Sequence, residues 1–302
     1  MSKKIVVVFG INHIVGNLVA KSILNSNQYI VRGVSTSSES MNIDFIEGIE
    51  TYNMSSMKDK SINEVLQDAS FCFIYTLTNF DDPNCIDTEI SLGCQIADYC
   101  KSSNVQHVVF CSQLHSNNIC SLMARHLVAK AEIEKYMRDI GLPLTCLILP
   151  VFYQDICETF KPTRWDKSVY YIEIPMGKTP LDLISRDDIG PIVVKVMQHS
   201  QEYLSKSLSV CGDKLCVQEI ATVLSKWLHP TIFKDKQISP FEFQQKRCTE
   251  LKGSNDYAAM FQFFQRVDQR YNLLNSKKLN PEVISFNDWV MVNVEKIKDL
   301  LK

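Results

Sequence analysis

The sequence predicts an α/β protein with a doubly wound parallel sheet, the Rossmann fold, followed by a smaller and mostly helical C-terminal domain. Three observations support this class. Short apolar runs alternate with helical patterns through the first half of the 302 residues, as in a sheet built from βαβ units. The first run ends at a glycine that leads directly into a helix. Hydrophobic residues make up 45% and charged residues 22% of the chain, as in proteins that bury a sizeable core.

The first predicted strand covers residues 5–9, a continuous apolar run of the kind found in strands that are buried on both faces. It ends at Gly10. Apolar residues then recur at helical spacing; they are Val15, Leu18, Val19, Ile23 and Leu24. A strand, a glycine turn and an amphipathic helix form the first half of a mononucleotide-binding unit.

The glycine turn is incomplete as a dinucleotide fingerprint. In the Gly-x-x-Gly-x-x-Gly form the glycines fall on positions 10, 13 and 16, and this chain has Gly10, His13 and Gly16. We expect the Cβ of His13 to crowd a diphosphate or to strain a backbone with positive φ. The helix N-terminus behind it still offers free N–H groups and a positive dipole end to an anion.

The following elements continue the alternation of strands and helices. The helix predicted over 85–102 carries the apolar stripe Ile86, Ile90, Cys94 and Ala97. A glycine and a proline at 141 and 143 end a later helix. Further strands are predicted at 29–34, 71–76, 107–111 and 144–149, with helices at 59–68 and from 125 to about 140.

The second half of the chain has a looser pattern. It predicts strands at 169–174 and 208–211, helices at 192–197 and 217–228, an aromatic-rich helical region, and a closing helix from about Asn287. Asp187 or Asp188 suits the cap or first turn of the helix at 192–197. We expect a dinucleotide-binding domain over 1–150 and a smaller domain over 151–302, with part of 182–212 returning to the sheet.

Two segments are placed to select a cofactor. An acid after the second strand favours NAD and an arginine favours NADP, but Thr36 stands there, with Arg32 inside the strand and Glu39 further on. The Ser/Thr cluster at 35–40 could hydrogen-bond a phosphate, although an ordinary turn is the favoured interpretation. Thr78 and Asn79 follow the strand at 71–76, where ligands bind in open α/β sheets.

His126 and Lys130 lie four residues apart and share a helical face. With Ser112 at a strand end, they resemble the Ser, Tyr and Lys of short-chain dehydrogenases, with histidine in the tyrosine place. A neutral imidazole could donate a proton to a developing alkoxide, but a polar surface histidine is an equal interpretation. For Lys130, a cofactor contact and a solvated helix face both remain open.

Composition excludes several classes of partner and site. The net charge of −2 and the pI of about 6.3 give no footprint for nucleic acid. No signal peptide and no run of about 20 apolar residues occurs, so we expect a location in the cytosol and also in the nucleus. The eleven cysteines contain no Cys-x-x-Cys pair; we expect small buried hydrophobes in a reducing compartment and no metal site.

Several blocks of sequence resemble one known family over nearly the whole chain. They are Lys-Ile-Val-Val-Val-Phe-Gly at 4–10, Ala-Glu-Ile-Glu-Lys-Tyr-Met-Arg-Asp-Ile-Gly-Leu-Pro at 131–143, Leu-Pro-Val-Phe-Tyr-Gln-Asp at 149–155, Ile-Pro-Met-Gly-Lys-Thr-Pro-Leu-Asp at 174–182, Asp-Ile-Gly-Pro at 188–191, Met-Phe-Gln-Phe at 260–263, Leu-Asn-Pro at 279–281, and Trp289. In these blocks the chain resembles the NmrA-like family of atypical short-chain dehydrogenases, and within it the redox-sensor branch of animals.

The resemblance implies an NADP-binding Rossmann domain and a smaller helical domain. It also implies a regulator without dehydrogenase activity, which responds to the NADP/NADPH balance through its conformation, oligomeric state, location and protein partners. No catalytic residue is implied. The implied cofactor contacts are Gly10, Ile11, Asn12, His13, Ile14 and Val15 at the pyrophosphate, Thr36 at the 2′-phosphate, Thr78 and Asn79 near the ribose, Lys130, and Phe152, Tyr153, Gln154 and Asp155 at the nicotinamide.

The chain departs from the family pattern in three parts of this site. Its loop reads Gly-Ile-Asn-His-Ile-Val-Gly where the family has Gly-Gly-Thr-Gly-Ala-Gln-Gly, Thr36 replaces an arginine, and Asn-Met-Ser-Ser-Met at 53–57 replaces an acidic cluster. We therefore expect a non-catalytic regulator that binds NADP(H) weakly and acts through regulatory protein partners, with a homodimer as one assembly and no direct contact with nucleic acid or membrane. The alternatives are a cofactor-free scaffold of the same fold and an NADPH-dependent reductase resembling isoflavone reductase.

Overall fold

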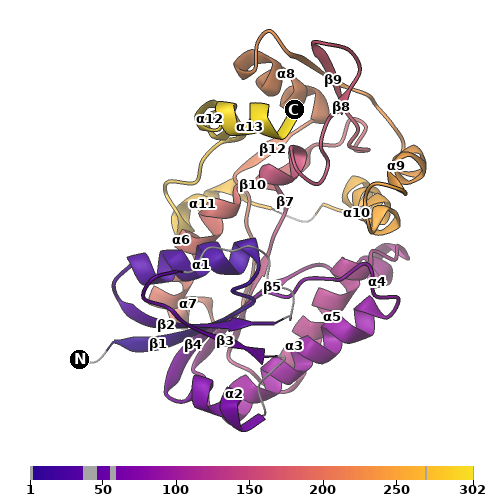
Figure 1. Ribbon diagram of the computed structural model, residues 1–302. Helices are drawn as coiled ribbons and strands as arrows, with labels where there is room; N and C mark the ends of the chain where they lie inside the picture. The colour runs from indigo at the N-terminus through magenta and orange to yellow at the C-terminus, as the bar shows by residue number, and fades with distance from the viewer. Residues whose placement is uncertain (1–2, 37–45, 55–58, 269–270, 302) are drawn as a thin grey trace. The chain divides into compact units, whose positions relative to one another are not determined.

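The structure, a computed structural model, describes residues 3–36, 46–54, 59–268 and 271–301 (Figure 1). The chain forms two compact units. The first unit comprises residues 1–114, 126–148 and 187–208, and the second comprises 115–125, 149–186 and 209–302. Each unit is described by itself.

The first unit is built on a seven-stranded sheet with the order β11-β6-β5-β4-β1-β2-β3. The pairings from β3 to β6 are all parallel. The chain order reverses between β1 and β4, which is where ligands bind in such sheets. The predicted Rossmann fold is confirmed. The strands are β1 (Lys4–Phe9), β2 (Tyr29–Ser35), β3 (Glu50–Asn53), β4 (Ala69–Ile74), β5 (His107–Ser112), β6 (Leu144–Ile148) and β11 (Ser207–Ser209).

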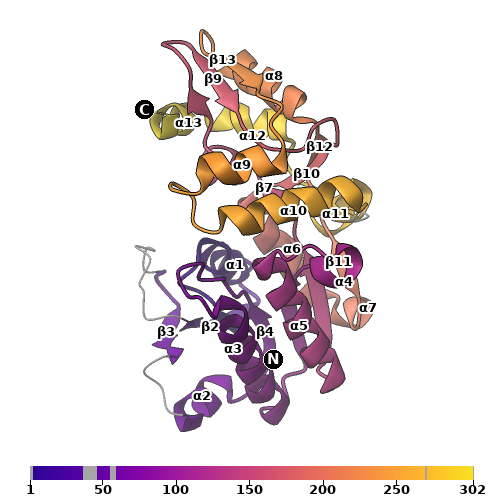
Figure 2. The ribbon, with the colours of Figure 1, turned by 90° about the vertical axis from the view of Figure 1, so that its right-hand side faces the viewer.

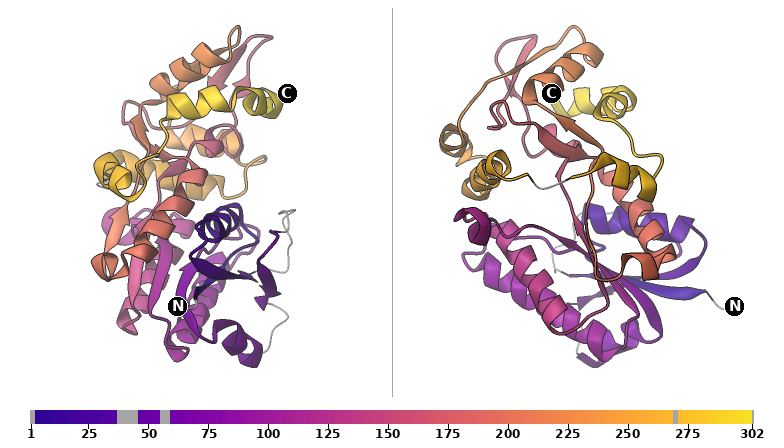
Figure 3. Two further views of the ribbon diagram at one scale, coloured as in Figure 1. Left: turned by 90° about the vertical axis from the view of Figure 1, so that its left-hand side faces the viewer. Right: turned by 180° about the vertical axis from the view of Figure 1, so that it is seen from behind.

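Helices cover both faces of this sheet. On one face, α1 (Ile14–Asn25) packs against α6 (Ile189–Gln198), as Figure 3 shows. The contact is close because Gly190 has no side chain: a Cβ there would lie 2.0 Å from the Ser22 hydroxyl oxygen. Asp188 is the N-cap residue of α6, as predicted, but its side chain makes no capping hydrogen bond. A short helix, α7 (Ser200–Tyr203), follows α6.

The other face carries α2 (Asp59–Leu66), α3 (Cys85–Ser102) and α5 (Arg125–Asp139), with α3 and α5 side by side (Figure 2). Val7 and Phe9 of β1 contribute to the core under these helices, and Val6 and Val8 are equally buried. The first strand is therefore buried on both faces, as its continuous apolar run predicts.

The predicted apolar stripe of α3 is buried only in part. Ala97 is buried and Ile90 packs against the core, whereas Ile86 and Cys94 are partly buried. The reason is Gly93, where a Cβ would lie 2.6 Å from the Ile133 Cδ1 of α5, so that α3 turns its glycine toward α5. The buried residues of α3 are Cys85, Glu89, Gly93, Ile96, Ala97 and Cys100.

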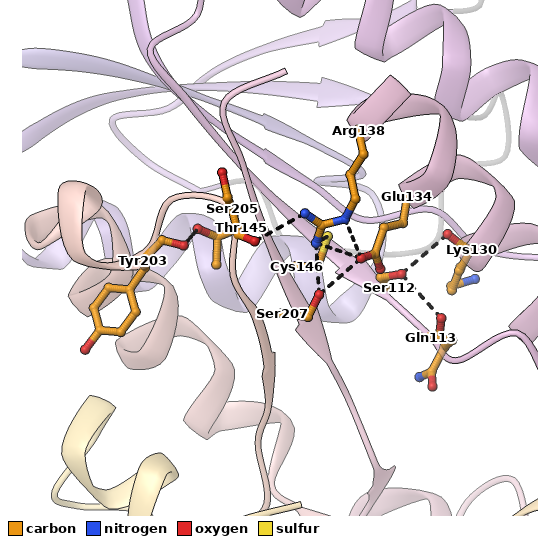
Figure 4. Close-up of polar contacts among 10 residues, drawn as sticks. All are labelled: Ser112, Gln113, Lys130, Glu134, Arg138, Thr145, Cys146, Tyr203, Ser205 and Ser207. Atoms are coloured by element: carbon orange, nitrogen blue, oxygen red, sulfur yellow. Dashed lines mark hydrogen bonds and ion pairs between the residues drawn. The ribbon is translucent and has the colours of Figure 1, made fainter. Parts of the chain in front are cut away.

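Strand β11 lies beside β6 at the edge of the sheet, and side-chain hydrogen bonds hold the segment there (Figure 4). Arg138 donates hydrogen bonds to the Ser207 hydroxyl at 2.9 Å and to the Ser205 carbonyl at 3.3 Å. Glu134 accepts from both Arg138 and Ser207, at 2.8 and 3.1 Å. The strand predicted at 208–211 is thus shorter and lies at 207–209, because these contacts hold the segment by its first residues.

The second unit contains two three-stranded sheets. Figure 1 and Figure 2 together label their strands. One sheet has the order β12-β10-β7 and the other β13-β9-β8. The strands are β7 (Val151–Phe152), β8 (Thr163–Arg164), β9 (Val169–Ile172), β10 (Leu181–Ile184), β12 (Asp213–Leu215) and β13 (Ile232–Asp235). The helices are α4 (Ser116–Cys120), α8 (Val217–Trp227), α9 (Pro240–Arg247), α10 (Ser254–Arg266), α11 (Leu273–Leu279), α12 (Phe286–Val292) and α13 (Val294–Leu301).

The aromatic residues of the C-terminal region form the core of the second unit. The ring of Tyr153, which is fully buried, lies 5.3 Å from Phe286 and 5.7 Å from Trp289, and its hydroxyl donates to the Ile284 carbonyl at 3.0 Å. The helix predicted from Asn287 begins one residue earlier and ends at Val292, where α13 follows after one residue. Across the residues that the structure describes, no helix is both long and apolar enough to span a bilayer.

All eleven cysteines are free thiols, and seven of them are buried. Burial raises the pKa of Cys211 to about 11 and that of Cys157 to about 12. In the described parts of the chain, no group of three or more His, Cys, Asp or Glu side chains could hold a metal ion.

Candidate functional site

The turn after β1 has the backbone geometry of a nucleotide-binding loop. Gly10 has a φ of +84°, and a Cβ on it would lie 2.3 Å from the Tyr75 carbonyl oxygen. A Cβ on Gly16 would lie 2.1 Å from the Gly10 carbonyl oxygen, so α1 can approach the turn only because this residue is glycine. The two glycines therefore turn the chain and seat the helix, as predicted.

His13 does not strain the backbone, and this part of the prediction is wrong. Its φ of −106° and ψ of 149° are extended, because position 13 is the N-cap of α1 and needs no glycine. The side chain is 7% exposed, and its Nε2 lies 3.4 Å from the Thr36 hydroxyl. The Asn12 side-chain oxygen accepts from the Thr36 N–H at 3.1 Å. Asn12, His13 and Thr36 thus tie the turn to the end of β2.

The other predicted residues of the turn differ in how far their side chains are buried. Ile11 is buried against Gly33, where a Cβ would lie 2.2 Å from the Ile11 Cδ1. Val15 is also buried, whereas Ile14 is 45% exposed. A ligand at this helix end would therefore meet backbone N–H groups and the Ile14 side chain.

A buried cluster lies at the end of β4 and joins three elements. Thr76 and Thr78, which follow β4, donate their hydroxyl hydrogens to the carboxylate of Glu89 on α3, the first at 2.6 Å. The Lys130 ammonium of α5 donates to the same carboxylate at 2.6 Å. The side chains of Lys130 and Glu89 are only 11% and 2% exposed.

The charges of this cluster stabilise one another. Burial alone would raise the pKa of Glu89, but the Lys130 ammonium and hydrogen bonds from Lys130, Thr76 and Thr78 keep it below its usual value. Burial and the Lys130 ammonium lower the pKa of His13, and Glu89 offsets this only in part. Glu89 is therefore ionised and His13 neutral at pH 7.

Glu89 is the site residue that sequence analysis missed. Acids in the middle of a helix normally face solvent, and the predicted stripe of α3 did not include position 89. The signal lies in the spacing Cys85, Glu89, Gly93: one helical turn before the Gly93–Ile133 contact, Glu89 meets Lys130.

The predicted ribose contacts Thr78 and Asn79 already have partners within the chain. The Thr78 hydroxyl donates to Glu89. Asn79 is exposed, and its side-chain oxygen accepts from the Asp81 N–H at 3.0 Å in a local turn. Of these two residues, only Asn79 has a side chain at the surface.

The three residues of the layout that resembles a short-chain dehydrogenase have these contacts. Ser112 donates to the backbone carbonyls of Gln113 and Lys130, both at 3.5 Å (Figure 4). The His126 ring packs edge-on against Phe80 with centroids 5.7 Å apart. The Lys130 ammonium is bound to Glu89.

The four predicted nicotinamide residues belong to the second unit and hold β7 in place there. Tyr153 has no exposed surface. Gln154 is buried; it donates to the Ser185 hydroxyl at 3.1 Å and accepts from the Arg186 N–H at 3.2 Å. Arg186 forms an ion pair with Asp155 and lies 5.6 Å above the ring of Phe152. Burial raises the pKa of Asp155, although Arg186 opposes this.

These residues fit one part of a dinucleotide better than another. The Gly10 turn and the N-terminus of α1 fit a pyrophosphate. No lysine or arginine occurs between residues 35 and 49 to pair with a 2′-phosphate. Arg32 donates to the carbonyls of Val65 and Gln67, at 2.7 and 2.9 Å. Two predicted segments lie partly outside the described residues. They are the Ser/Thr cluster from residue 37 to 40, which includes Glu39, and residues 55–57 of the segment at 53–57.

Comparisons with known proteins agree with this fold. A family model described as "NmrA-like family" matches residues 2–290. NmrA, a negative transcriptional regulator in complex with NADP, has 14% identity and a TM-score of 0.80 over 99% of this chain and 98% of that chain. NmrA in complex with NAD has 15% identity and a TM-score of 0.81 over 100% of this chain and 99% of that chain. The Citrobacter sp. triphenylmethane reductase complexed with NADP(H) has 13% identity and a TM-score of 0.73 over 99% of this chain and 100% of that chain. At these identities, the likeness to the solved structures shows the fold alone.

Proposed function

Because this chain belongs to the NmrA-like family, we propose that it is a non-catalytic redox-sensing regulator that binds NADP(H) weakly and acts through protein partners. Its neighbour NmrA is a negative transcriptional regulator, and we extend that role to this chain, with partners in the cytoplasm and the nucleus. The observation that carries the proposal is the state of Lys130, whose ammonium is bound to the buried carboxylate of Glu89.

The Lys130–Glu89 pair supports a role without catalysis. Bound NADPH supplies a hydride, and a reductase also needs a residue that delivers a proton to the product. Lys130 is bound to Glu89, and Ser112 donates to backbone carbonyls. Neither side chain is therefore positioned for that step.

The geometry of the turn supports the binding of NADP(H). The lack of a cation for the 2′-phosphate supports a low affinity. Backbone N–H groups at the N-terminus of α1 would hold the pyrophosphate, because those of Gly10, Ile11 and His13 already donate to carbonyls within the chain. Asn12, the neutral His13 and the Thr36 hydroxyl would meet the adenosine ribose side with uncharged hydrogen bonds. A charge-assisted contact to phosphate contributes about 1.5–3 kcal/mol, so its absence lowers affinity about 10- to 100-fold.

The test is calorimetric titration of NADPH, NADP and NAD into the wild-type protein and into a variant that carries both His13→Gly and Thr36→Arg. We expect weak NADPH binding by the wild type and binding about 10- to 100-fold tighter by the double variant, because a guanidinium can pair with the 2′-phosphate. Thr222→Arg, on the exposed side of α8 in the second unit, is the control for added charge.

Two results would contradict this proposal. Micromolar NADPH binding by the wild type would show that the altered loop does not weaken the site. NADPH oxidation that depends on an added carbonyl substrate and disappears in Lys130→Ala would establish a reductase.

A cofactor-free scaffold of the same fold is the second candidate. It is favoured by the hydrogen bonds that Asn12 and His13 make to Thr36, since these satisfy polar groups that would otherwise face a ligand. A partner that binds equally well with and without NADP(H), together with no nucleotide binding by either protein in the titration, would establish this role.

A further inference from the structure

The sheet β13-β9-β8 of the second unit has one buried face and one face with exposed side chains. Side chains alternate between the two faces of a strand. Tyr170 and Ile172 of β9 and Phe233 of β13 are buried. Tyr171 lies opposite Lys234 on the outer face, and Ile232 on that face is 46% exposed.

Aromatic rings and a lysine form a platform on this outer face. Trp165, which follows β8, is 69% exposed. Its ring meets the ring of Tyr171 edge-to-face, with centroids 5.8 Å apart. The Lys236 ammonium lies 4.3 Å from the Tyr171 ring and 5.4 Å from the Trp165 ring. These contacts hold the indole in place without burying it. We call Trp165, Tyr171, Ile232, Lys234 and Lys236 the aromatic–lysine face.

Positive charge dominates the surroundings of this face. Among the residues that the structure describes there, the lysines without a carboxylate within 4 Å are Lys167, Lys234 and Lys236. Arg164 pairs with Tyr170 of the buried face, and its guanidinium donates to the carbonyls of Asp166 and Lys167.

Two acids lie on the same segments as these lysines. Asp166 accepts from the N–H groups of Ser168 and Val169, at 2.7 and 2.9 Å, and these bonds together with the Lys234 charge lower its pKa. Asp235 accepts from the Gln237 N–H at 2.8 Å. Neither carboxylate lies within 4 Å of Lys167, Lys234 or Lys236, and the three lysines outnumber the two acids.

The partner must contact side chains rather than add a strand beside β13. The hydroxyl of Ser225 on α8 accepts from the Phe233 N–H at 2.7 Å and donates to the Ala221 carbonyl of its own helix at 2.8 Å. The free edge of β13 is thus capped in its middle, and the accessible feature is the face itself.

The charge of this face favours one class of binding partner over the others. A second copy related by a two-fold axis would place these cations opposite one another, and like charges oppose such contact. The net charge of −2 for the whole chain gives no general attraction to nucleic acid. A protein segment rich in Asp and Glu complements the lysines, and an apolar or aromatic side chain within it would pack on Trp165.

We propose that the aromatic–lysine face binds an acidic segment of a partner protein that also carries an aromatic or large apolar side chain. This inference deepens the proposed function by naming the class of partner. It does not depend on nucleotide binding, because no cofactor residue takes part.

The test uses the full-length protein and a library of random 12-residue peptides displayed on phage. Selected peptides are synthesised, labelled and titrated by fluorescence anisotropy at low and at physiological salt. We expect them to be rich in Asp and Glu and to contain an aromatic residue. Their affinity should fall at least tenfold for Trp165→Ala and for Lys234→Glu combined with Lys236→Glu, and it should decrease with salt.

Lys226→Glu is the matched control, because Lys226 also lies over an indole, 4.6 Å from the ring of Trp227, but on α8. It should leave peptide affinity unchanged. The inference is overturned if no peptide is selected, if the peptides are neutral or basic, or if the face variants bind as well as the wild type. It is also overturned if single-stranded oligothymidylate binds the same lysines more tightly than the peptides do.

Nucleotide titration of the Lys234→Glu and Lys236→Glu variant distinguishes failure of this inference from failure of the proposed function. The variant should bind NADPH as the wild type does, whatever the peptide result.

Discussion

At the scale of single residues, His107 at the start of β5 is a buried base whose two ring nitrogens have different environments. Thr145 donates its hydroxyl hydrogen to the Tyr203 carbonyl at 2.7 Å, so it accepts from the Nε2–H of His107, also at 2.7 Å. In the described structure, Nδ1 of His107 is buried without a hydrogen-bond partner. Burial lowers the pKa of His107 to about 4, so the folded protein holds this ring neutral.

This difference predicts a pH-dependent stability. Between pH 6.5 and 4 the unfolded chain, with an ordinary histidine pKa of about 6.5, binds a proton that the folded chain does not. The free energy of unfolding should therefore decrease by up to about 3 kcal/mol as pH falls through this window. Urea unfolding of the wild type and of His107→Gln at pH 7, 5.5 and 4.5 measures it.

The glutamine variant keeps a donor toward Thr145 but cannot gain a proton. Its stability should decrease less than that of the wild type over the same pH range. An equal decrease for both proteins would show that His107 does not cause the effect.

Glu89 shows why some site residues cannot be predicted from the sequence. The Gly10 turn, Gly16 and Lys130 belong to local patterns, and sequence analysis found them. The ion pair of Glu89 with Lys130 joins residues 41 positions apart, and it exists because two helices pack closely through Gly93. The extended backbone of His13 also follows from its N-cap position, which a motif comparison does not contain.

At the scale of elements, the contact between α3 and α5 depends on a single missing side chain. Gly93→Ala places a Cβ 2.6–2.7 Å from three atoms of Ile133, and overpacking of this kind costs about 1–3 kcal/mol. We expect the urea midpoint to fall accordingly, and Ser91→Ala on the exposed side of α3 to have little effect. A Gly93→Ala protein as stable as the wild type would show that the helices can separate freely.

The strands differ in how well their own residues predict them. β1, β4, β5 and β6 are buried, so each appears as an apolar run in the sequence. β3 has the sequence Glu-Thr-Tyr-Asn, and it is a strand because β2 pairs with it in register. Backbone hydrogen bonds to β2 stabilise this strand, and such bonds require no apolar pattern in its side chains.

At the scale of the whole molecule, thiol reactivity should follow burial. Cys248 is exposed, Cys94, Cys120 and Cys216 are partly buried, and the other seven are buried. Because the thiolate is the reactive form, the native protein should react quickly with Ellman's reagent at one site, slowly at up to three, and at the remaining seven only after unfolding. Fast reaction of more than one thiol, or reaction of more than four thiols in the folded protein, would contradict this description.

The two units are connected more than once. The chain passes between them after residues 114, 125, 148, 186 and 208, so neither unit is one continuous segment. Sequence analysis expected part of 182–212 to return to the sheet. It did not expect residues 115–125 in the second unit, because no composition change marks that segment.

This connectivity affects the order in which a ribosome can complete the protein. The strands β1 to β6 leave the exit tunnel first, while α6, which covers the same face as α1, and the edge strand β11 follow only by residue 209. During that interval α1 lacks the helix that packs against it at Leu18 and Ser22. This face of the nascent sheet therefore stays incompletely covered until α6 ends at Gln198, 50 residues after β6 ends at Ile148, at the stage when chaperones bind growing chains.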